Sequence, residues 1–375
     1  MVVSVLHVTQ PTDAGVARCV ADFAADQHRE GWQVTVACPP EGPLTGWLQD
    51  GGGADVRPWP ATRAPGPSVV GETRRLRALI SDLRPDITHL HSSKAGLAGR
   101  LALRGRRPTV FQPHAWSFDA VRGPVRFASL RWERLAARWA HAVICVSDAE
   151  QARGRDAGIA AHYTIVPNGV DLAAYDAASP TDRAAARARL EIAPDAPLVV
   201  CVGRLSRQKG QDVLLAAWPA VLRAAPGARL VLVGDGPDRA ALERAALQSA
   251  ASSTVCFAGR RNDVADWLAA ADVVVAPSRW EGLSLTVLEA MARGRSVVAS
   301  DVTGMRELVG PGSGALVPPG NPAALAAALA ARLTNRSVVG AEGAAARRSA
   351  ERHDLRHTCA GVRRVYADVL AGRHA

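Results

Sequence analysis

The sequence predicts an α/β protein made of two doubly wound domains, each with a parallel sheet covered by helices on both faces. Short apolar runs alternate with stretches rich in Ala, Arg and Leu, which is typical of parallel strands joined by crossover helices. The length of 375 residues suits two domains of ordinary size. Hydrophobic residues make up 48% of the chain and charged residues 21%, which favours a folded core over a disordered chain.

The predicted strands fall into two sets. The apolar runs of the first half lie at 2–8, 33–38, 87–90, 109–112, 142–146 and 164–166. Those of the second half lie at 197–202, 229–233, 254–258, 273–276 and 296–299. Between the sets, a Pro-Asn-Gly turn precedes a segment rich in Ala, Asp and Pro. We therefore expect an N-terminal domain at residues 1–170 and a C-terminal domain at residues 171–357.

Three helical stretches bear on function. One is expected at 285–293, stopped by Gly294. Another, at 125–139, interleaves arginines with apolar residues and suits either an anionic lipid surface or packing against its own domain. The third is an Arg-rich tail at 342–370, whose charges suit a solvated face.

The charge balance favours anionic ligands. Lys plus Arg exceeds Asp plus Glu by 45 − 35 = 10, and Lys94 and Lys209 are the only lysines. Nucleotides, acidic lipids and nucleic acid would all be attracted. No apolar run reaches the roughly 18 residues of a membrane span, and the six cysteines are scattered without metal-ligand spacing. These features predict a cytoplasmic protein with reduced thiols.

Chemistry is expected in the loops that follow the strands, because open parallel sheets bind ligands beyond the carboxyl ends of their strands. After 197–202, a Gly-rich basic loop carries Arg204 and Lys209, which suit two phosphates but equally a solvated turn. After 273–276, Glu281 lies on a loop and Glu289 inside the next helix. Either carboxylate alone is also an ordinary surface charge.

Taken together, these loops resemble the retaining enzymes of glycosyltransferase family 4. The resemblance covers nearly the whole chain, since the stretches 86–96, 113–116, 166–171 and 234–237 also match family motifs. It implies the GT-B fold, in which two Rossmann-like domains face a central cleft. The helix at 358–372 would pack back on the first domain.

The resemblance also implies roles for residues of the C-terminal domain. Arg204 and Lys209 would bind the diphosphate of a nucleotide sugar, and Glu289 its ribose. Glu281 would act at the transferred sugar, and Arg261 is a weaker candidate beside the base. The backbone that follows Glu281 would also contact the donor, through Gly282, Leu283 and Ser284. The family's frequent Glu-Gly-Phe-Gly pattern is absent there, which leaves the donor sugar open.

In the N-terminal domain, Gly15 sits where the family commonly has paired glycines, although the first of the pair is Ala14 here. Gly15 would let the backbone approach a donor phosphate. His114 resembles the family's histidine that contacts the sugar or acceptor, and we expect it to act in catalysis together with Glu281. His91 and Lys94 are weaker acceptor-side candidates, and His89 and His91 would share one face of a strand.

The leading hypothesis is a retaining glycosyltransferase (a hexosyltransferase of class EC 2.4) that needs no cofactor and no metal. The donor would be a nucleoside-diphosphate sugar, and the acceptor a sugar, a lipid-linked molecule or a small molecule. The segments at 89–96 and 113–116 resemble those of bacterial enzymes that build polysaccharides, which favours polysaccharide, glycolipid or glycoconjugate synthesis. The positive charge would suit peripheral contact at the inner face of the plasma membrane. Donor identity, linkage and oligomeric state stay open.

Several alternatives remain. A small natural product could be the acceptor, and a sugar-nucleotide epimerase or phosphorylase would share the fold. A nicotinamide dehydrogenase is disfavoured because no GxGxxG follows the first strand. A basic nucleic-acid-binding protein or a non-catalytic scaffold is the rival of a different class, although the chain has few aromatic residues and no known reader motif.

Overall fold

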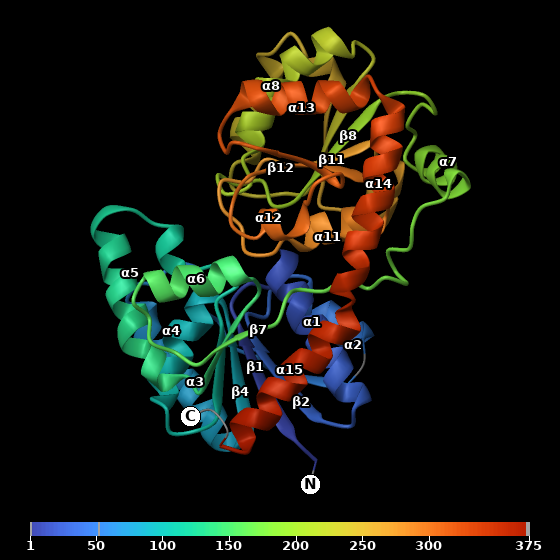
Figure 1. Ribbon diagram of the computed structural model, residues 1–375. Helices are drawn as coiled ribbons and strands as arrows, with labels where there is room; N and C mark the ends of the chain where they lie inside the picture. The colour runs from blue at the N-terminus through green and yellow to red at the C-terminus, as the bar shows by residue number, and fades with distance from the viewer. Residues whose placement is uncertain (1, 52, 373–375) are drawn as a thin grey trace. The chain divides into compact units, whose positions relative to one another are not determined.

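The chain folds into two compact units, each built on a parallel sheet (Figure 1). The computed structural model describes residues 2–51 and 53–372. Among these residues, unit 1 contains those up to Pro167 and those from His357 onward, and unit 2 is Asn168–Arg356. The sequence placed the joint after residue 170, and the structure divides the chain three residues earlier.

Unit 1 has a seven-stranded sheet in the order β3-β2-β1-β4-β5-β6-β7, and every strand pair is parallel. Its strands are β1 Ser4–Thr9, β2 Gln33–Cys38, β3 Ala54–Pro58, β4 Ile87–His91, β5 Thr109–Gln112, β6 Ala142–Cys145 and β7 Tyr163–Ile165. Six of them were predicted, and β3 is an additional edge strand. The central strands β1 and β4 are almost fully buried, as expected for a sheet covered on both faces.

The helices of unit 1 fill the crossovers between its strands. They are α1 Ala14–Arg29, α2 Leu44–Asp50, α3 Ser68–Leu83, α4 Ser92–Leu103, α5 Gly123–Ala136 and α6 Asp148–Asp156. The C-terminal helix α15, Leu355–Leu370, adds a further layer. Tyr366 of α15 is fully buried in this unit, and Arg363 forms an ion pair with Asp26 of α1. The chain's last helix is therefore part of unit 1, although unit 2 precedes it in the sequence.

Unit 2 has a six-stranded parallel sheet in the order β10-β9-β8-β11-β12-β13. Its strands are β8 Leu198–Val202, β9 Arg229–Val233, β10 Val255–Gly259, β11 Val273–Ala276, β12 Ser296–Ser300 and β13 Gly314–Val317. Its helices are α7 Pro180–Arg189, α8 Gln211–Ala224, α9 Arg239–Leu247, α10 Val264–Ala270, α11 Leu285–Ala292, α12 Met305–Leu308, α13 Pro322–Leu333 and α14 Arg336–Ala350. The edge strand β13 was not predicted. The order is that of a Rossmann sheet, which confirms the predicted fold class.

The strand order fixes where each unit can hold a ligand. In both sheets, the first strand lies between its sequence neighbour and a later strand: β1 between β2 and β4, and β8 between β9 and β11. The chain runs from the first strand toward one side of the sheet and later returns to the other side. A crevice therefore opens at the carboxyl ends of β1 and β4, and of β8 and β11. The loops after β1 and β4, and after β8 and β11, are therefore the first places to look for a site.

No helix in the described part of the chain is long and apolar enough to cross a bilayer.

Candidate functional site

The switch point of unit 2 brings Lys209 and Glu281 together. Lys209 ends the loop after β8 and Glu281 lies in the loop after β11, and the two side chains form an ion pair. The side chain of Glu281 is 9% exposed and that of Lys209 22%, so the pair faces solvent mainly through the side chain of Lys209. Ser278 donates a hydrogen bond of 2.8 Å to the same carboxylate oxygen of Glu281.

The two loops are fastened to each other through their backbones. The amide of Arg279 donates to the carbonyl of Gln208 at 2.7 Å, and the Gln208 side chain donates to the carbonyl of Trp280 at 3.2 Å. Gly210 makes the approach possible, since its φ is +68° and an ideal Cβ there would lie 2.1 Å from the Pro277 carbonyl oxygen. The spacing of Lys209 and Glu281 is therefore set by the backbone.

Arg204 supplies a second cation in the loop after β8. It is half-buried, and no described residue pairs with its guanidinium group. Its backbone carbonyl accepts a 2.9 Å hydrogen bond from the side chain of Gln211, which is buried at the start of α8. The loop is thus anchored by its backbone, and the Arg204 guanidinium is left for a ligand.

The stretch that follows Glu281 is buried and leads directly into α11. Leu283 and Ser284 are 4% and 6% exposed. The carbonyl of Leu283 accepts a 2.7 Å hydrogen bond from Asn168, which belongs to the predicted Pro-Asn-Gly turn. Glu289 lies in the second turn of α11 and is partly buried. The role of Asn168 in holding this loop was not predicted.

Arg261 does not join this group of residues. It lies just beyond β10, where both sides of its guanidinium group are bound to Asp263 at 2.8 and 2.5 Å. The pair is solvent-exposed, and Asp263 has a lowered pKa because of the hydrogen bonds from Arg261. A base-binding role for Arg261 would require it to leave this partner.

At the switch point of unit 1, Ala14 and Gly15 open α1 and are exposed. Ala14 has a φ of +57°, in the left-handed region that glycine enters without cost. The backbone at position 14 therefore adopts a conformation that favours glycine, although the residue is alanine.

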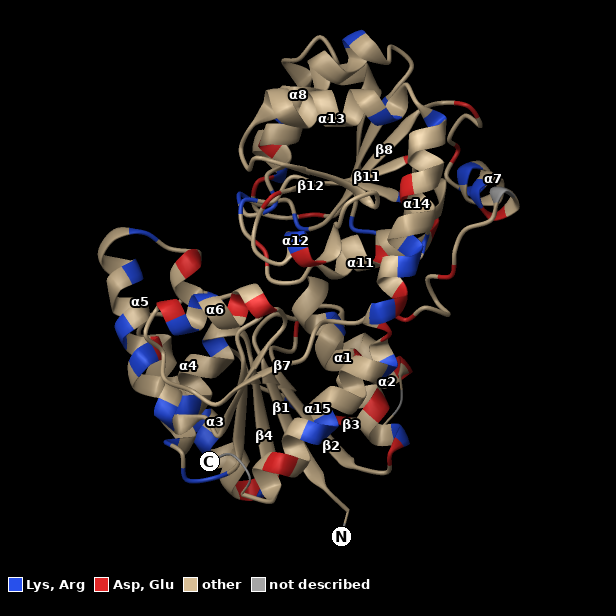
Figure 2. Ribbon diagram, viewed as in Figure 1, with Lys and Arg blue, Asp and Glu red and all other residues tan. Residues whose placement is uncertain are grey.

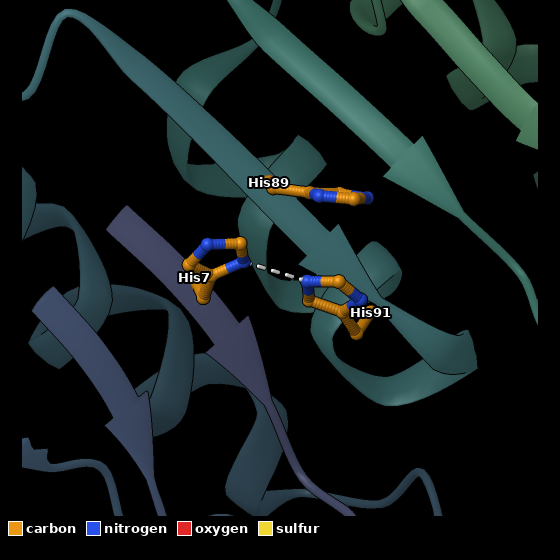
Figure 3. Close-up of side chains that lie close together, drawn as sticks. All are labelled: His7, His89 and His91. Carbon is orange, nitrogen blue, oxygen red and sulfur yellow. Dashed lines mark hydrogen bonds between the residues drawn. The ribbon is translucent and has the colours of Figure 1, made fainter. Parts of the chain in front are cut away.

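The same switch point holds a cluster of buried histidines (Figure 3). His7 of β1 pairs in register with His89 of β4, and His91 follows on the same face. The rings of His89 and His91 lie 3.9 Å apart between centroids, which confirms the predicted shared face. His7 was not predicted, because its neighbours depend on which strand lies beside β1.

Hydrogen bonds connect this cluster to His114. Nδ1 of His7 lies 2.9 Å from Nε2 of His91, and Nδ1 of His91 lies 3.2 Å from Nε2 of His114. Burial lowers the pKa of His7 to about 4 and that of His114 to about 3, and it holds the pKa values of His89 and His91 well below the usual range. All four rings are neutral near pH 7.

The turn that carries His114 is strained. His114 has a φ of +56° and Ala115 a φ of +144°, both in regions that L-residues seldom occupy. The following Trp116 is buried, and its indole donates a 2.8 Å hydrogen bond to the carbonyl of Glu150. Such strain persists only where surrounding contacts hold it, and it is typical of functional sites.

The two weaker acceptor-side candidates are placed in the interior. The ammonium group of Lys94 lies 2.8 Å from Glu72, with both side chains at most 4% exposed, and it also donates to the carbonyl of Ala64. Lys94 therefore compensates a buried carboxylate and does not face a ligand. His91 is fully buried, so it can reach a substrate only through His114.

Comparisons with known proteins identify the family of the chain. Residues 14–174 match the model described as Glycosyltransferase Family 4, and residues 196–335 match that described as Glycosyl transferases group 1. A GDP-mannose-dependent phosphatidylinositol monomannoside mannosyltransferase of Corynebacterium glutamicum is 38% identical over 161 residues, 40% of this chain. This chain spans only 42% of the length of that relative.

Two further proteins match over more of their length. The alpha-maltose-1-phosphate synthase of Mycolicibacterium smegmatis is 34% identical over 274 residues, which are 66% of this chain and 70% of that protein. The crystal structure of Anabaena HepE in complex with UDP and glucose superimposes with a TM-score of 0.84 at 25% identity, covering 97% of this chain and 99% of HepE. The chain therefore belongs to the family 4 glycosyltransferases and has the GT-B fold.

Proposed function

We propose that this protein is a retaining glycosyltransferase that moves a sugar from a nucleoside-diphosphate sugar to an acceptor hydroxyl. The observation that carries the proposal is the Lys209–Glu281 pair at the switch point between β8 and β11. Arg204 lies in the loop of Lys209, and none of the described residues pairs with its guanidinium group. Two cations beside one fixed carboxylate suit a diphosphate joined to a polyhydroxyl group.

In the proposed reaction, Lys209 and Arg204 stabilise the charge that develops on the leaving diphosphate. They take the part that a divalent ion takes in other enzymes, so transfer should not require a metal. Glu281 orients Lys209 and accepts a hydrogen bond from a hydroxyl of the transferred sugar. Glu289 accepts a hydrogen bond from a hydroxyl of the ribose. His114, in unit 1, contacts the sugar or the acceptor.

Retention is proposed to follow a front-face path. The bond from the anomeric carbon to the diphosphate breaks, the acceptor oxygen bonds to the same face, and its proton passes to the departing phosphate oxygen. The carboxylate of Glu281 is bound by both Lys209 and Ser278. These contacts suit a carboxylate that binds and orients the sugar, and they suit a covalent nucleophile less well.

The acceptor is proposed to be a sugar or lipid-linked molecule presented at an anionic membrane. Basic residues recur along the ribbon of α5 (Figure 2). On this helix, the apolar side chains of Val125 and Phe127 are 58% and 61% exposed, and Arg126 and Arg131 are exposed as well. Exposed apolar side chains among arginines suit the interface of an anionic bilayer. Nucleic acid is not proposed as a partner.

The donor site is tested by thermal unfolding with UDP, GDP, ADP or dTDP in the presence of EDTA. A ligand at 100 times its Kd stabilises the native state by about 2.7 kcal/mol. We expect one nucleoside diphosphate to raise the unfolding midpoint, and Lys209→Ala to abolish that rise. Lys209→Ala and Glu281→Ala should each slow sugar transfer by at least about tenfold without unfolding the protein.

Arg207→Ala is the matched control, because Arg207 is an exposed cation two residues from Lys209 in the same loop. It should retain both the stabilisation and the turnover. Unchanged transfer in both site variants would contradict the assignment. Release of free nucleoside diphosphate without a glycosylated product would favour an epimerase or phosphorylase.

A further inference from the structure

Four side chains form a continuous line of hydrogen bonds through the interior of unit 1. Gln27 of α1 places its carboxamide oxygen 2.7 Å from Nε2 of His7. From Nδ1 of His7 the line continues to Nε2 of His91 at 2.9 Å, and from Nδ1 of His91 to Nε2 of His114 at 3.2 Å. Gln27, His7 and His91 are at most 1% exposed, so the line is shielded from bulk solvent.

The line has only one consistent set of protons once its first acceptor is fixed. A neutral imidazole carries one N–H donor and one acceptor nitrogen, whereas the carboxamide oxygen of Gln27 can only accept. Nε2 of His7 therefore donates to Gln27, and Nδ1 of His7 accepts from His91. Since Nε2 of His91 carries the proton of that ring, Nδ1 of His91 is an acceptor. Nε2 of His114 must then carry a proton and donate it to Nδ1 of His91.

Tyr366 of α15 binds the remaining histidine of the cluster. Its buried phenol oxygen lies 2.6 Å from Nδ1 of His89. His89 thus binds Tyr366 and not the line that leads to His114, although its ring lies against those of His7 and His91.

We propose that Gln27, His7 and His91 are positioning residues that hold His114 in a single neutral tautomer, with its proton on Nε2 and a lone pair on Nδ1. The Nδ1 atom then accepts a hydrogen bond from a hydroxyl of the sugar or acceptor. This use of the lone pair rests on the proposed function, whereas the tautomer itself does not. The left-handed backbone at His114 and Ala115 sets the position of the ring.

A metal site is the competing chemical explanation of the cluster. One nitrogen from each of His7, His89 and His91 lies within 4.8 Å of the others. However, the nitrogens of His7 and His91 are already 2.9 Å apart, the distance of a direct hydrogen bond. The geometry therefore favours the hydrogen-bonded line, and metal content becomes an outcome of the test.

The tautomer can be read by long-range ¹H–¹⁵N correlation spectra of the full chain labelled in its histidines. At about pH 7.5 we expect His114 to show a protonated Nε2 and an unprotonated Nδ1. His7→Leu removes an acceptor from the line and should give a mixture of His114 tautomers. His7→Gln should restore the single tautomer, because a carboxamide can both donate to Gln27 and accept from His91.

His89→Leu is the matched control, since it removes a ring from the same buried cluster without interrupting the line. It should leave the His114 tautomer unchanged. The transfer rate at saturating donor should fall at least about tenfold in His7→Leu and recover in His7→Gln, with donor affinity unchanged in both.

Three results would overturn the inference: a proton on Nδ1 of His114 in the wild type, a His114 tautomer that does not respond to His7→Leu, or one equivalent of tightly bound zinc by elemental analysis. If His7→Leu does not fold, the wild-type spectrum alone decides the tautomer. A single Nε2–H tautomer in a protein that transfers no sugar would support the inference and contradict the proposed function.

Discussion

Gly304 packs against the loop that carries Glu281, in a place where a side chain would not fit. Its φ is +79°, and an ideal Cβ there would lie 1.5 Å from the carbonyl oxygen of Gly282. An alanine must displace that carbonyl together with the backbone beside Glu281. We predict that Gly304→Ala weakens nucleoside diphosphate binding at least about tenfold and lowers the free energy of unfolding by about 1–3 kcal/mol. Titration calorimetry and urea unfolding measure the two effects.

Gly312→Ala separates close contact from backbone strain. Gly312 has nearly the same φ, +80°, but no atom lies within 4 Å of its ideal Cβ. This variant should lose about 1 kcal/mol of stability through strain and bind nucleotide normally. Equal loss of binding in the two variants would show that Gly304 acts only through its backbone conformation.

Single residues differ in how far the sequence could place them. Lys209 and Glu281 were proposed separately, 72 positions apart, and the structure joins them in one ion pair. Lys94 was a weaker acceptor-side candidate, because an ammonium group suits an acceptor phosphate. Its partner Glu72 lies on another helix, and the sequence carries no sign of their contact. His7 and Gln27 were missed for the same reason, since long-range neighbours depend on the fold.

Among the elements, the sequence predicted the central strands and missed two at the edges. The central strands are apolar runs buried on both faces, which is what a parallel sheet requires. The strand β3 is mostly exposed and ends at Pro58, and β13 begins at Gly314. The sequence of β3 lacks the apolar run of a central strand. The apolar run of β13 is only four residues long and three of them are partly buried, because an edge strand buries less surface.

For the helix α5, the sequence predicted the element but not which of its apolar residues are buried. Its apolar residues suited either packing or a lipid surface, and the structure buries some of them and exposes others. Leu130 packs against the core of unit 1, whereas Val125, Phe127 and Leu135 are exposed. Arg131 lies 5.6 Å over the ring of Phe127. This helix thus presents both apolar and cationic groups to solvent.

We predict that α5 binds vesicles that contain anionic lipid. The Val125→Ser/Phe127→Ser double variant should reduce co-sedimentation with phosphatidylglycerol vesicles several-fold, because it removes apolar side chains that would enter the interface. Salt should weaken the wild-type binding by screening the arginines. Val70→Ser on α3 is the control, since Val70 is 58% exposed, as Val125 is. Binding that Val70→Ser and the double variant reduce equally would contradict a role for α5.

For the whole molecule, the alternation of strands and helices was enough to predict two doubly wound units, but it could not give the strand order. The site depends on that order, since Lys209 and Glu281 meet only because β8 lies beside β11. The return of α15 to unit 1 likewise followed from the family resemblance and not from any local pattern. Local sequence thus determines the elements, and their adjacency determines the chemistry.

The two units differ in how their histidines respond to acid. Unit 1 holds His7, His89, His91 and His114, all with lowered pKa values because of burial. In unit 2 the sequence has only His353, whose pKa is lowered by partial burial. A buried histidine whose pKa is lower in the folded state is protonated first in the unfolded state. Acid therefore favours unfolding, starting near the ordinary pKa of 6.5.

We predict that unit 1 loses stability before unit 2 as the pH falls from about 7.5 to about 5. For His7, with a folded-state pKa of about 4, the loss by about pH 5 is about 2 kcal/mol, and the other three histidines add to it. Proteolysis after partial urea unfolding, with fragments identified by mass spectrometry, reads each unit separately. His7→Gln should reduce the pH dependence of unit 1 by up to about 1.4 kcal/mol per pH unit and leave that of unit 2 unchanged. Equal pH dependence in the two units would mean that the buried histidines are not neutral in the native protein.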